Sequence, residues 1–211
     1  IMISSYGKIY AIGHRELKDL FVGNVLISEK IDGSQISFGL FNDELKIRSK
    51  GQEINTEVPE KMFSEAVEYI KSIKDKLISN ATYRGEYLKK PHHNALSYDH
   101  IPQNHICLFD IDLGNQSYVL YEAIVSEAER LGTGCVPRLF EGNGAEVNQD
   151  KFNEFMEKIS VLGGAKIEGV VVKNYSKFGA DGKVLMGKYV SEAFKEVHRK
   201  EWKQSNPTNK D

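Results

Sequence analysis

Cysteine is scarce in this chain of 211 residues, which holds only Cys107 and Cys135. Both lie in apolar surroundings, and they lack the Cys-x-x-Cys spacing of zinc and redox sites. The sequence therefore argues against a disulfide framework, and we expect two buried free thiols. This use of cysteine fits a reducing cytoplasm, that of the host cell if the chain is viral.

Long apolar runs, a secretory signal and a strong net charge are also lacking. No segment is long and apolar enough to cross a bilayer, so we expect no membrane association. The formal net charge is −2, and any grip on nucleic acid must therefore come from a local patch. We find no internal repeat or low-complexity linker, and expect a monomer with a single domain over residues 1–211 and a polar tail at 203–211.

A β-hairpin is predicted between residues 34 and 50. Ile36, Phe38 and Leu40 alternate with polar or small residues, which is the period of a strand. Asn42 and Asp43 both tolerate positive φ, so they suit a two-residue turn. Pairing the residues on either side of this turn puts the apolar residues on one face. The other face then carries a polar set: Gln35, Ser37, Gly39, Lys46, Arg48 and Lys50.

The rest of the chain alternates between strand patterns and helix patterns. Apolar residues at helical spacing predict helices over 59–77, 120–131 and 152–159, and a last helix follows residue 190. Strands are predicted at 25–27, 81–88, 105–113, 165–174 and 183–190. Because hairpins join many of these strands and helices stand between them, the pattern favours an α+β architecture over a βαβ winding.

Ionisable residues interrupt several of these apolar or strand-forming segments. Such groups are rarely buried unless they are paired, so their presence in strands favours a shared polar site. The alternative for each of them is a side chain that simply points outward from its sheet. The residues concerned are Lys30, Arg48, Glu86, Asp110, Glu168, Lys173 and Lys188.

Six short segments follow one another along the chain in the order EKIDG, RSKG, RGEY, LFDI, EGVVVK and GKYV. In this order they resemble the covalent nucleotidyltransferase superfamily of ATP-dependent ligases and capping enzymes, and most closely its RNA ligase 2-like branch. The resemblance runs from about Val25 to Phe194, and EKIDG and EGVVVK are its specific elements. It implies a nucleotidyltransferase (ATP-grasp-like) domain of antiparallel sheets flanked by helices.

The resemblance also implies roles for individual residues. It makes Lys30 the nucleophile that takes AMP from ATP, an attack that requires the amine to lose its proton. Magnesium is the implied metal, since a polyphosphate substrate and oxygen ligands favour it over zinc. The other implied contacts are Glu29 at the adenine edge, Phe109 stacked on the base, Glu86 on the ribose, Arg48 or Lys50 on phosphate, Glu168 with magnesium, and Lys188 at the α-phosphate. Lys188, Lys173 and the bound magnesium are the cations that would lower the pKa of Lys30.

One position departs from the family pattern. The family usually ends its last segment with two lysines one residue apart, whereas this chain has Met186 and Lys188. Residues two apart on a strand share a face, so both side chains are expected to point the same way. Met186 either leaves room for a second cation or forms an apolar floor under the nucleotide.

The function that the resemblance implies is ATP-dependent RNA ligation, as used in RNA repair. Lys30 takes AMP, the AMP passes to a 5′-phosphate end, and a 3′-hydroxyl displaces it to seal the strand. A DNA ligase or a capping guanylyltransferase is the first alternative, disfavoured because only about twenty residues follow Val190, too few for the five-stranded barrel of those families. The second is a non-catalytic RNA-binding module on the same fold, and the presence of Lys30 with its glutamates argues against it.

Overall fold

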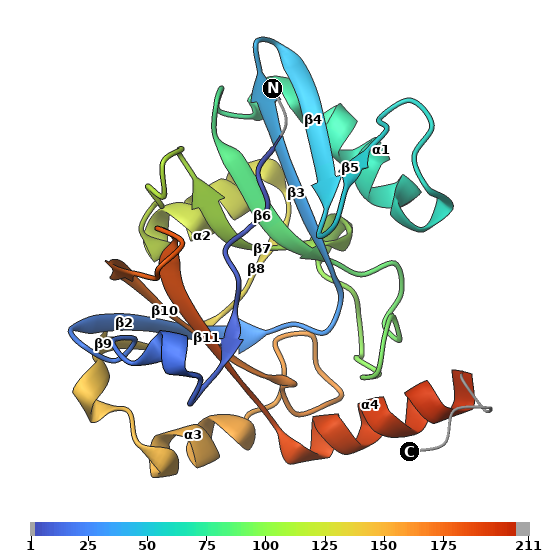
Figure 1. The fold of residues 1–211 in the computed structure, drawn as a ribbon. Helices are drawn as coiled ribbons and strands as arrows, with labels where there is room; N and C mark the ends of the chain where they lie inside the picture. Colours follow the sequence, from blue (N-terminus) through green and yellow to red (C-terminus); the bar gives the residue numbers. More distant parts are fainter. Residues whose placement is uncertain (1–2, 206–211) are drawn as a thin grey trace. The chain divides into compact units, whose positions relative to one another are not determined.

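The computed structural model describes residues 3–205 and divides the chain into two compact units, each built on its own sheet (Figure 1). The six-stranded unit comprises Gly33–Lys90 and Ile101–Val136, together with the N-terminal residues up to Lys8. The five-stranded unit comprises Ile9–Asp32, Pro91–His100 and the chain from Pro137 onward. The expected single domain over 1–211 stays a prediction.

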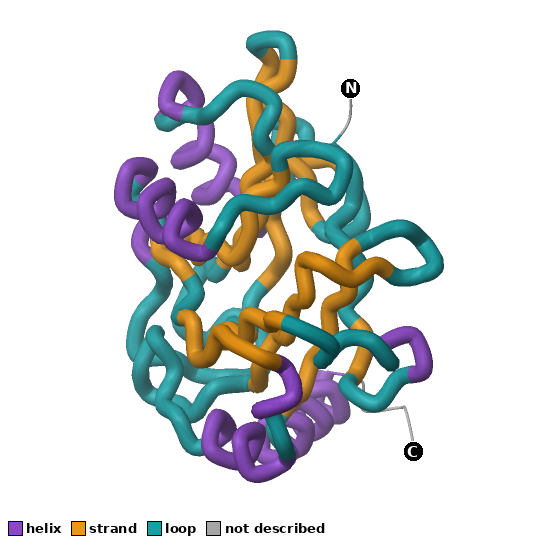
Figure 2. Tube along the Cα trace, turned by 90° about the vertical axis from the view of Figure 1, so that its left-hand side faces the viewer, coloured by secondary structure: helices purple, strands orange, loops and turns teal. Residues whose placement is uncertain are grey.

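The six-stranded sheet has the strand order β5-β4-β3-β6-β7-β8, and only its last pair is parallel. Helices α1 (Ser64–Ser72) and α2 (Tyr121–Leu131) form one apolar core with the sheet. They are the purple helices at the upper left of Figure 2. The strands are β3 (Ser34–Phe41), β4 (Glu44–Ser49), β5 (Glu53–Ile54), β6 (Thr82–Tyr87), β7 (Ile106–Asp112) and β8 (Gly134–Cys135).

The predicted hairpin is confirmed as the pair β3 and β4. Asn42 and Asp43 form its turn with φ of 51° and 62°, the left-handed values that such a turn needs. Phe38 lies opposite Ile47, and both belong to the core. Ser37 lies opposite Arg48, on the other face. The period-2 pattern together with the turn residues was therefore enough to fix this register.

The five-stranded sheet has the order β1-β11-β10-β2-β9, antiparallel except where β1 joins β11. Its core contains Ile27, Val170 and Leu185 from the sheet and Phe152 and Phe155 from α3. The elements are β1 (Tyr10–Ala11), β2 (Asn24–Lys30), β9 (Arg138–Asn143), α3 (Gln149–Met156), β10 (Gly169–Phe178), β11 (Val184–Val190) and α4 (Glu192–Ser205).

The mixed α+β class is confirmed, with four helices among the described residues and two mostly antiparallel sheets. The predicted helix over 59–77 is shorter than expected: α1 covers only Ser64–Ser72, with 3₁₀ turns on both sides. Strands β1, β5, β8 and β9 were not predicted. Of the expected polar tail at 203–211, only the residues up to Ser205, at the end of α4, lie within the described part.

Two smaller expectations concern cysteine and membranes. Cys107 is buried, Cys135 is half-buried, and both are free thiols. Among residues 3–205, no helix has the length and apolar character that crossing a bilayer requires.

Candidate active site

Three lysines lie on one face of the five-stranded sheet because of how its central strands pair. Lys30 on β2 is opposite Gly169 on β10, and Lys188 on β11 is opposite Val171. Lys173 is two residues beyond Val171 on β10, so it points to the same face. The opposite face of these strands carries the apolar core of the unit. The register thus gathers the predicted nucleophile, Lys30, and the two predicted neighbouring cations, Lys173 and Lys188, on one face of the sheet.

The Lys30 ammonium forms an ion pair with Glu168, the residue just before β10. Its Nζ lies 2.9 Å from Oε1 of Glu168, and the Glu168 side chain is only 6% exposed. The second carboxylate oxygen, Oε2, is buried and has no hydrogen-bond partner among the described residues. A buried carboxylate oxygen without a donor is costly, and such an atom suits a metal ligand.

The environment of Glu168 favours its protonated form. Burial raises the pKa of this carboxyl to about 7, and the nearby Asp32 carboxylate adds to the rise. The Lys30 ammonium, and more weakly Lys188, pull the same pKa down. Desolvation therefore outweighs the ion pair in the absence of a further cation.

This raised pKa makes stability depend on pH. The folded chain holds the Glu168 proton up to about pH 7, whereas the unfolded chain releases it near 4.5. The stabilisation of the folded state by the protonated Glu168 carboxyl is fully present below pH 4.5, and it is lost as the pH rises to about 7. We expect the wild type to lose about 3 kcal/mol more stability than Glu168→Gln between pH 4.5 and 7.5, measured by urea unfolding.

The matched control is Glu157→Gln in the same unit. Glu157 also pairs with a lysine, Lys166, but its side chain is 72% exposed. We expect its stability curve to run parallel to that of the wild type. If Glu168→Gln also ran parallel to the wild type, the carboxyl would not be desolvated as its burial indicates.

Lys173 and Met186 are direct neighbours across β10 and β11, and both are buried. Met186 shares its face with Lys188, because the two residues are separated by one position on a regular strand. The predicted common direction of Met186 and Lys188 therefore follows from the register. The full burial of Met186 favours the apolar floor over an open place for a second cation.

Glu29 points to the other face of β2, since neighbouring residues on a strand alternate. Its carboxylate accepts hydrogen bonds from the Ser160 hydroxyl at 2.6 Å and from the Val161 N–H at 2.9 Å. Burial raises the Glu29 pKa, and these two hydrogen bonds oppose the rise. Glu29 is thus a buried carboxylate held by residues more than a hundred positions away, and Ser160 was not predicted.

Asp32 anchors a separate part of the chain beside the Lys30 segment. One of its carboxylate oxygens accepts the N–H groups of Ala95 and Leu96, each at 2.8 Å. The Asp32 N–H donates to the Tyr98 hydroxyl at 2.9 Å. These contacts tie residues 91–100 to the end of β2. The sequence pointed to the EKIDG segment but gave no role to Asp32, and no signal marked Tyr98.

In the six-stranded unit, Arg48 lies on the predicted polar face and is held by backbone. Its Nη1 donates to the Ile3 carbonyl at 3.0 Å, and its Nη2 approaches the Lys50 carbonyl at 3.4 Å. The Arg48 Nε is buried without a hydrogen-bond partner among the described residues. Lys50 itself is exposed. Arg48 is therefore the better oriented of the two candidate cations.

Glu86 lies on the same polar face, at the end of β6. Its Oε1 accepts the N–H of Gly33 at 3.2 Å. Gly33 also fits tightly against β6, because a Cβ there would stand 2.6 Å from the Tyr87 carbonyl oxygen. Close packing against β6 is thus a sufficient reason for glycine at this position.

Phe109 is the extra residue of a β-bulge. Gly85 pairs with Leu108 and Arg84 with Asp110, so the register between β6 and β7 skips Phe109. Bulges redirect side chains, and here Phe109 is half-buried and outside the apolar core, while Leu108 belongs to it. This placement argues against Phe109 being an ordinary core residue of its strand.

The structure places the predicted residues in two groups, one in each unit. The five-stranded unit carries Glu29, Lys30, Glu168, Lys173 and Lys188. The six-stranded unit carries Arg48, Glu86 and Phe109. Within residues 3–205 there is no cluster of three or more histidine, cysteine or acidic side chains suited to a metal. A divalent ion at Glu168 would need oxygen ligands from phosphate and water as well, which is typical of magnesium.

Solved structures of RNA and DNA ligases share this fold. Naegleria gruberi RNA ligase with PPi matches with a TM-score of 0.65 and 19% identity, over 94% of this chain and 58% of that one. A point mutant of the same ligase with ATP and Mn matches with a TM-score of 0.65 and 19% identity, over 93% of this chain and 58% of that one. A putative ATP-dependent DNA ligase from Aquifex aeolicus matches with a TM-score of 0.62 and 18% identity, over 91% of this chain and 51% of that one. The chain thus spans little more than half the length of these proteins.

No curated protein sequence matches the chain. A sequence model of the family described as RNA ligase matches residues 23–190, which include every predicted site residue. This match covers most of the chain, and its span agrees with the resemblance carried by the six ordered segments. The chain belongs to the RNA ligase family.

Proposed function

We propose that this protein is an ATP-dependent RNA ligase working through a lysyl–AMP intermediate on Lys30. The Lys30 amine attacks the α-phosphorus of ATP; a nitrogen–phosphorus bond forms, pyrophosphate leaves, and the amine proton passes to solvent. A 5′-phosphate oxygen then attacks the bound AMP phosphorus and frees the lysine. Finally a 3′-hydroxyl attacks the activated 5′-phosphate and releases AMP, which seals the strand.

The observation that carries the proposal is the Lys30–Glu168 pair at 2.9 Å, on a strand face that also bears Lys173 and Lys188. Most phosphoryl-transfer catalysis is alignment and charge neutralisation, which a fixed set of cations supplies. Lys188 is proposed to contact the α-phosphate, and the buried Lys173 to add positive charge beneath it.

Magnesium is the proposed metal, held by the unpartnered Oε2 of Glu168. Bound there, the ion would neutralise phosphate charge and favour the deprotonated amine of Lys30. Support for a divalent ion comes from the Naegleria gruberi structure solved with ATP and Mn. Glu168 orients Lys30 through the 2.9 Å contact between its Oε1 and the Lys30 Nζ.

The remaining site residues are proposed to bind the rest of the nucleotide. Phe109 stacks on adenine, Glu86 accepts from the ribose hydroxyls, and Arg48, in preference to Lys50, meets phosphate. Glu29 borders the adenine edge. Because Ser160 and Val161 already donate to its carboxylate, Glu29 can accept from a base only through its remaining lone pairs.

Strand joining tests this function and its alternative. The likeness to a putative ATP-dependent DNA ligase makes DNA the second candidate strand. The full chain is incubated with ATP, magnesium and nicked or single-stranded substrates bearing a 5′-phosphate and a 3′-hydroxyl. We expect joining when the 3′-hydroxyl strand is RNA. Joining of all-DNA ends at an equal rate would favour the DNA ligase. Self-labelling with GTP but not ATP would indicate a capping enzyme. If the protein neither labels itself nor joins strands, it would instead be a non-catalytic RNA-binding module. The proposed monomer and cytoplasmic setting are independent of this test.

Loss of Phe109 is expected to affect nucleotide use more than folding. A base–aromatic stack is worth about 1–3 kcal/mol, so Phe109→Ala should raise the KM for ATP by roughly 5- to 150-fold. The control is Phe38→Leu in the core of the same unit, which should lower Tm and leave the KM unchanged. An unchanged KM with a much lower Tm for Phe109→Ala would make Phe109 a packing residue.

A further inference from the structure

Two fully buried charged residues of the six-stranded unit have no part in the proposed chemistry. Arg84 on β6 is 1% exposed, and its cross-strand neighbour Asp110 on β7 is 0% exposed. Such residues are almost never buried unless they are paired. Both lie on the face that also carries Arg48 and Glu86, which makes their contacts relevant to the site.

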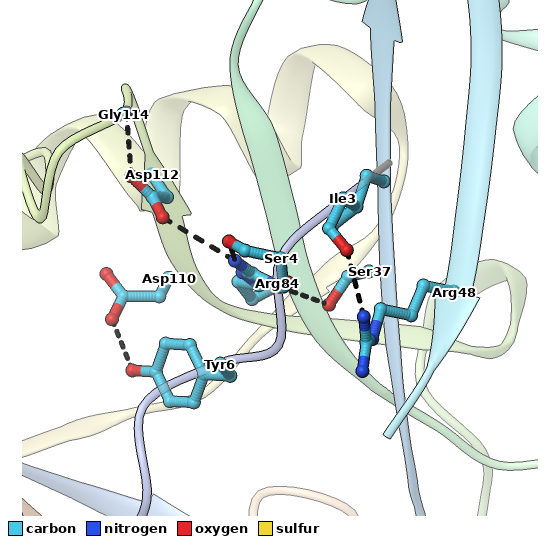
Figure 3. Close-up of polar contacts among 9 residues, drawn as sticks. All are labelled: Ile3, Ser4, Tyr6, Ser37, Arg48, Arg84, Asp110, Asp112 and Gly114. Carbon is cyan, nitrogen blue, oxygen red and sulfur yellow. Dashed lines mark hydrogen bonds and ion pairs between the residues drawn. The ribbon is translucent and has the colours of Figure 1, made fainter. Parts of the chain in front are cut away.

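Within the unit, Arg84 pairs with Asp112 at 3.5 Å and donates to the Ser37 hydroxyl at 3.0 Å. The N-terminal segment, residues 3–6, crosses this face and supplies further contacts to both residues (Figure 3). Arg84 Nη1 donates to the Ser4 carbonyl at 2.8 Å, next to the Ile3 carbonyl that receives Arg48. The Tyr6 hydroxyl donates to Asp110 Oδ2 at 2.5 Å. A segment of four residues thus binds side chains from β4, β6 and β7.

The Tyr6 ring is itself fixed from several sides. Its centroid lies 5.1 Å from that of Phe109 at an interplanar angle of 69°, and 6.1 Å from that of Tyr118 at 88°. The Arg84 guanidinium carbon lies 5.6 Å from the Tyr6 centroid. Tyr6 is therefore a buried ring in edge-to-face contact with a half-buried one, an arrangement that aromatic pairs favour.

Phe109 needs such a neighbour because of its place in the bulge. The register between β6 and β7 skips it, and it does not belong to the apolar core. A stacking ring binds best when its orientation is set before the ligand arrives. Tyr6 contacts Phe109 directly, and its hydroxyl ties it to Asp110, the residue that follows Phe109.

We propose that Tyr6 is a positioning residue of the nucleotide site, which holds the Phe109 ring in the orientation that stacks on adenine. The inference rests on the proposed function of Phe109. It makes the N-terminal segment part of the nucleotide site in addition to its packing role. Tyr6 acts through Phe109 and not through contact with the reacting atoms.

The test measures ATP binding by calorimetry on the full chain carrying Lys30→Ala, so that no turnover occurs. Tyr6→Leu removes the ring and should weaken binding by about 10-fold, a part of the effect of losing the stack. Tyr6→Phe keeps the ring and should bind ATP within about 2-fold, even if losing the Asp110 hydrogen bond lowers its Tm. In a Phe109→Ala background, Tyr6→Leu should have no further effect on binding.

The matched control is Tyr83→Leu. Tyr83 is a fully buried tyrosine of the same unit that stacks on Phe38, so its loss should lower Tm and leave ATP affinity unchanged. Equal ATP affinity of Tyr6→Leu and wild-type Tyr6 would overturn the inference, as would fully additive effects of Tyr6→Leu and Phe109→Ala. If Tyr6→Leu does not fold, a 10-fold loss with Tyr6→Phe would overturn it, since that variant keeps the ring. Failure of the wild type to form lysyl–AMP would bear on the proposed function alone.

Discussion

Lys30→Ala is expected to lose covalent labelling by AMP completely. Only Lys30 carries an amine held at the end of β2 by Glu168, at 2.9 Å, among the residues proposed for the phosphate side. Lys30→Arg should fail as well, because a guanidinium does not deprotonate at working pH. The measurement is protein-bound label after incubation with α-labelled ATP and magnesium, and the expected loss exceeds about 10³-fold.

Lys166→Ala serves as the control for this experiment. Lys166 lies in the same unit and also pairs with a glutamate, Glu157, but its side chain is 55% exposed. It should label like the wild type. Persistent labelling of Lys30→Ala would move the nucleophile to another lysine.

Lys188→Ala should reduce the single-turnover rate of adenylylation by about 10²- to 10³-fold, the usual cost of losing one preorganised contact to a developing charge. The neighbouring place on its face is taken by Met186, so that no second lysine on β11 can compensate. Exposed Lys195, which pairs with Glu192, is the control and should have no effect. A near wild-type rate for Lys188→Ala would shift the phosphate contact to Lys173 or to Lys183, the residue just before β11.

The burial of Met186 leads to a prediction for the stability of Met186→Lys. Met186→Lys would place an ammonium directly across from Lys173, and both positions are buried. Like charges opposite each other on neighbouring strands destabilise a sheet, and burial adds to the cost. We expect a lower Tm for this variant. An unchanged Tm with faster adenylylation would instead mean that position 186 has room for a second cation.

Local patterns made much of the fold predictable. The β3–β4 hairpin follows from alternation and from two residues that accept positive φ. Helix α2 ends at Leu131, as predicted, and Gly132 caps it with φ of 73°. Strands β1 and β8 have two residues each and exist through pairing with distant strands. Strand β9 lacks a clear alternation of buried and exposed residues. Their positions depend on tertiary contacts, which the sequence does not display.

The candidate site was predictable where a charged residue stood in a strand. Lys30, Glu168 and Lys188 were singled out as candidates because they interrupt apolar or strand-forming segments, and the family resemblance implied their roles. The register places the two lysines on one face. The supporting contacts were not predictable, because they join residues far apart in the chain. Ser160 binds Glu29 across 131 positions, and Tyr6 binds Asp110 across 104. Tyrosine and serine give no charge signal, so their roles appear only in the folded chain.

Lys30 is tested most directly as the nucleophile by the mass of the wild-type protein after incubation with ATP and magnesium, followed by peptide mapping. We expect an added mass of one AMP group on the peptide that contains Lys30, and we expect acid to remove it, because a phosphoramidate is acid-labile. An unmodified protein, or an AMP group on any other residue, would contradict this expectation.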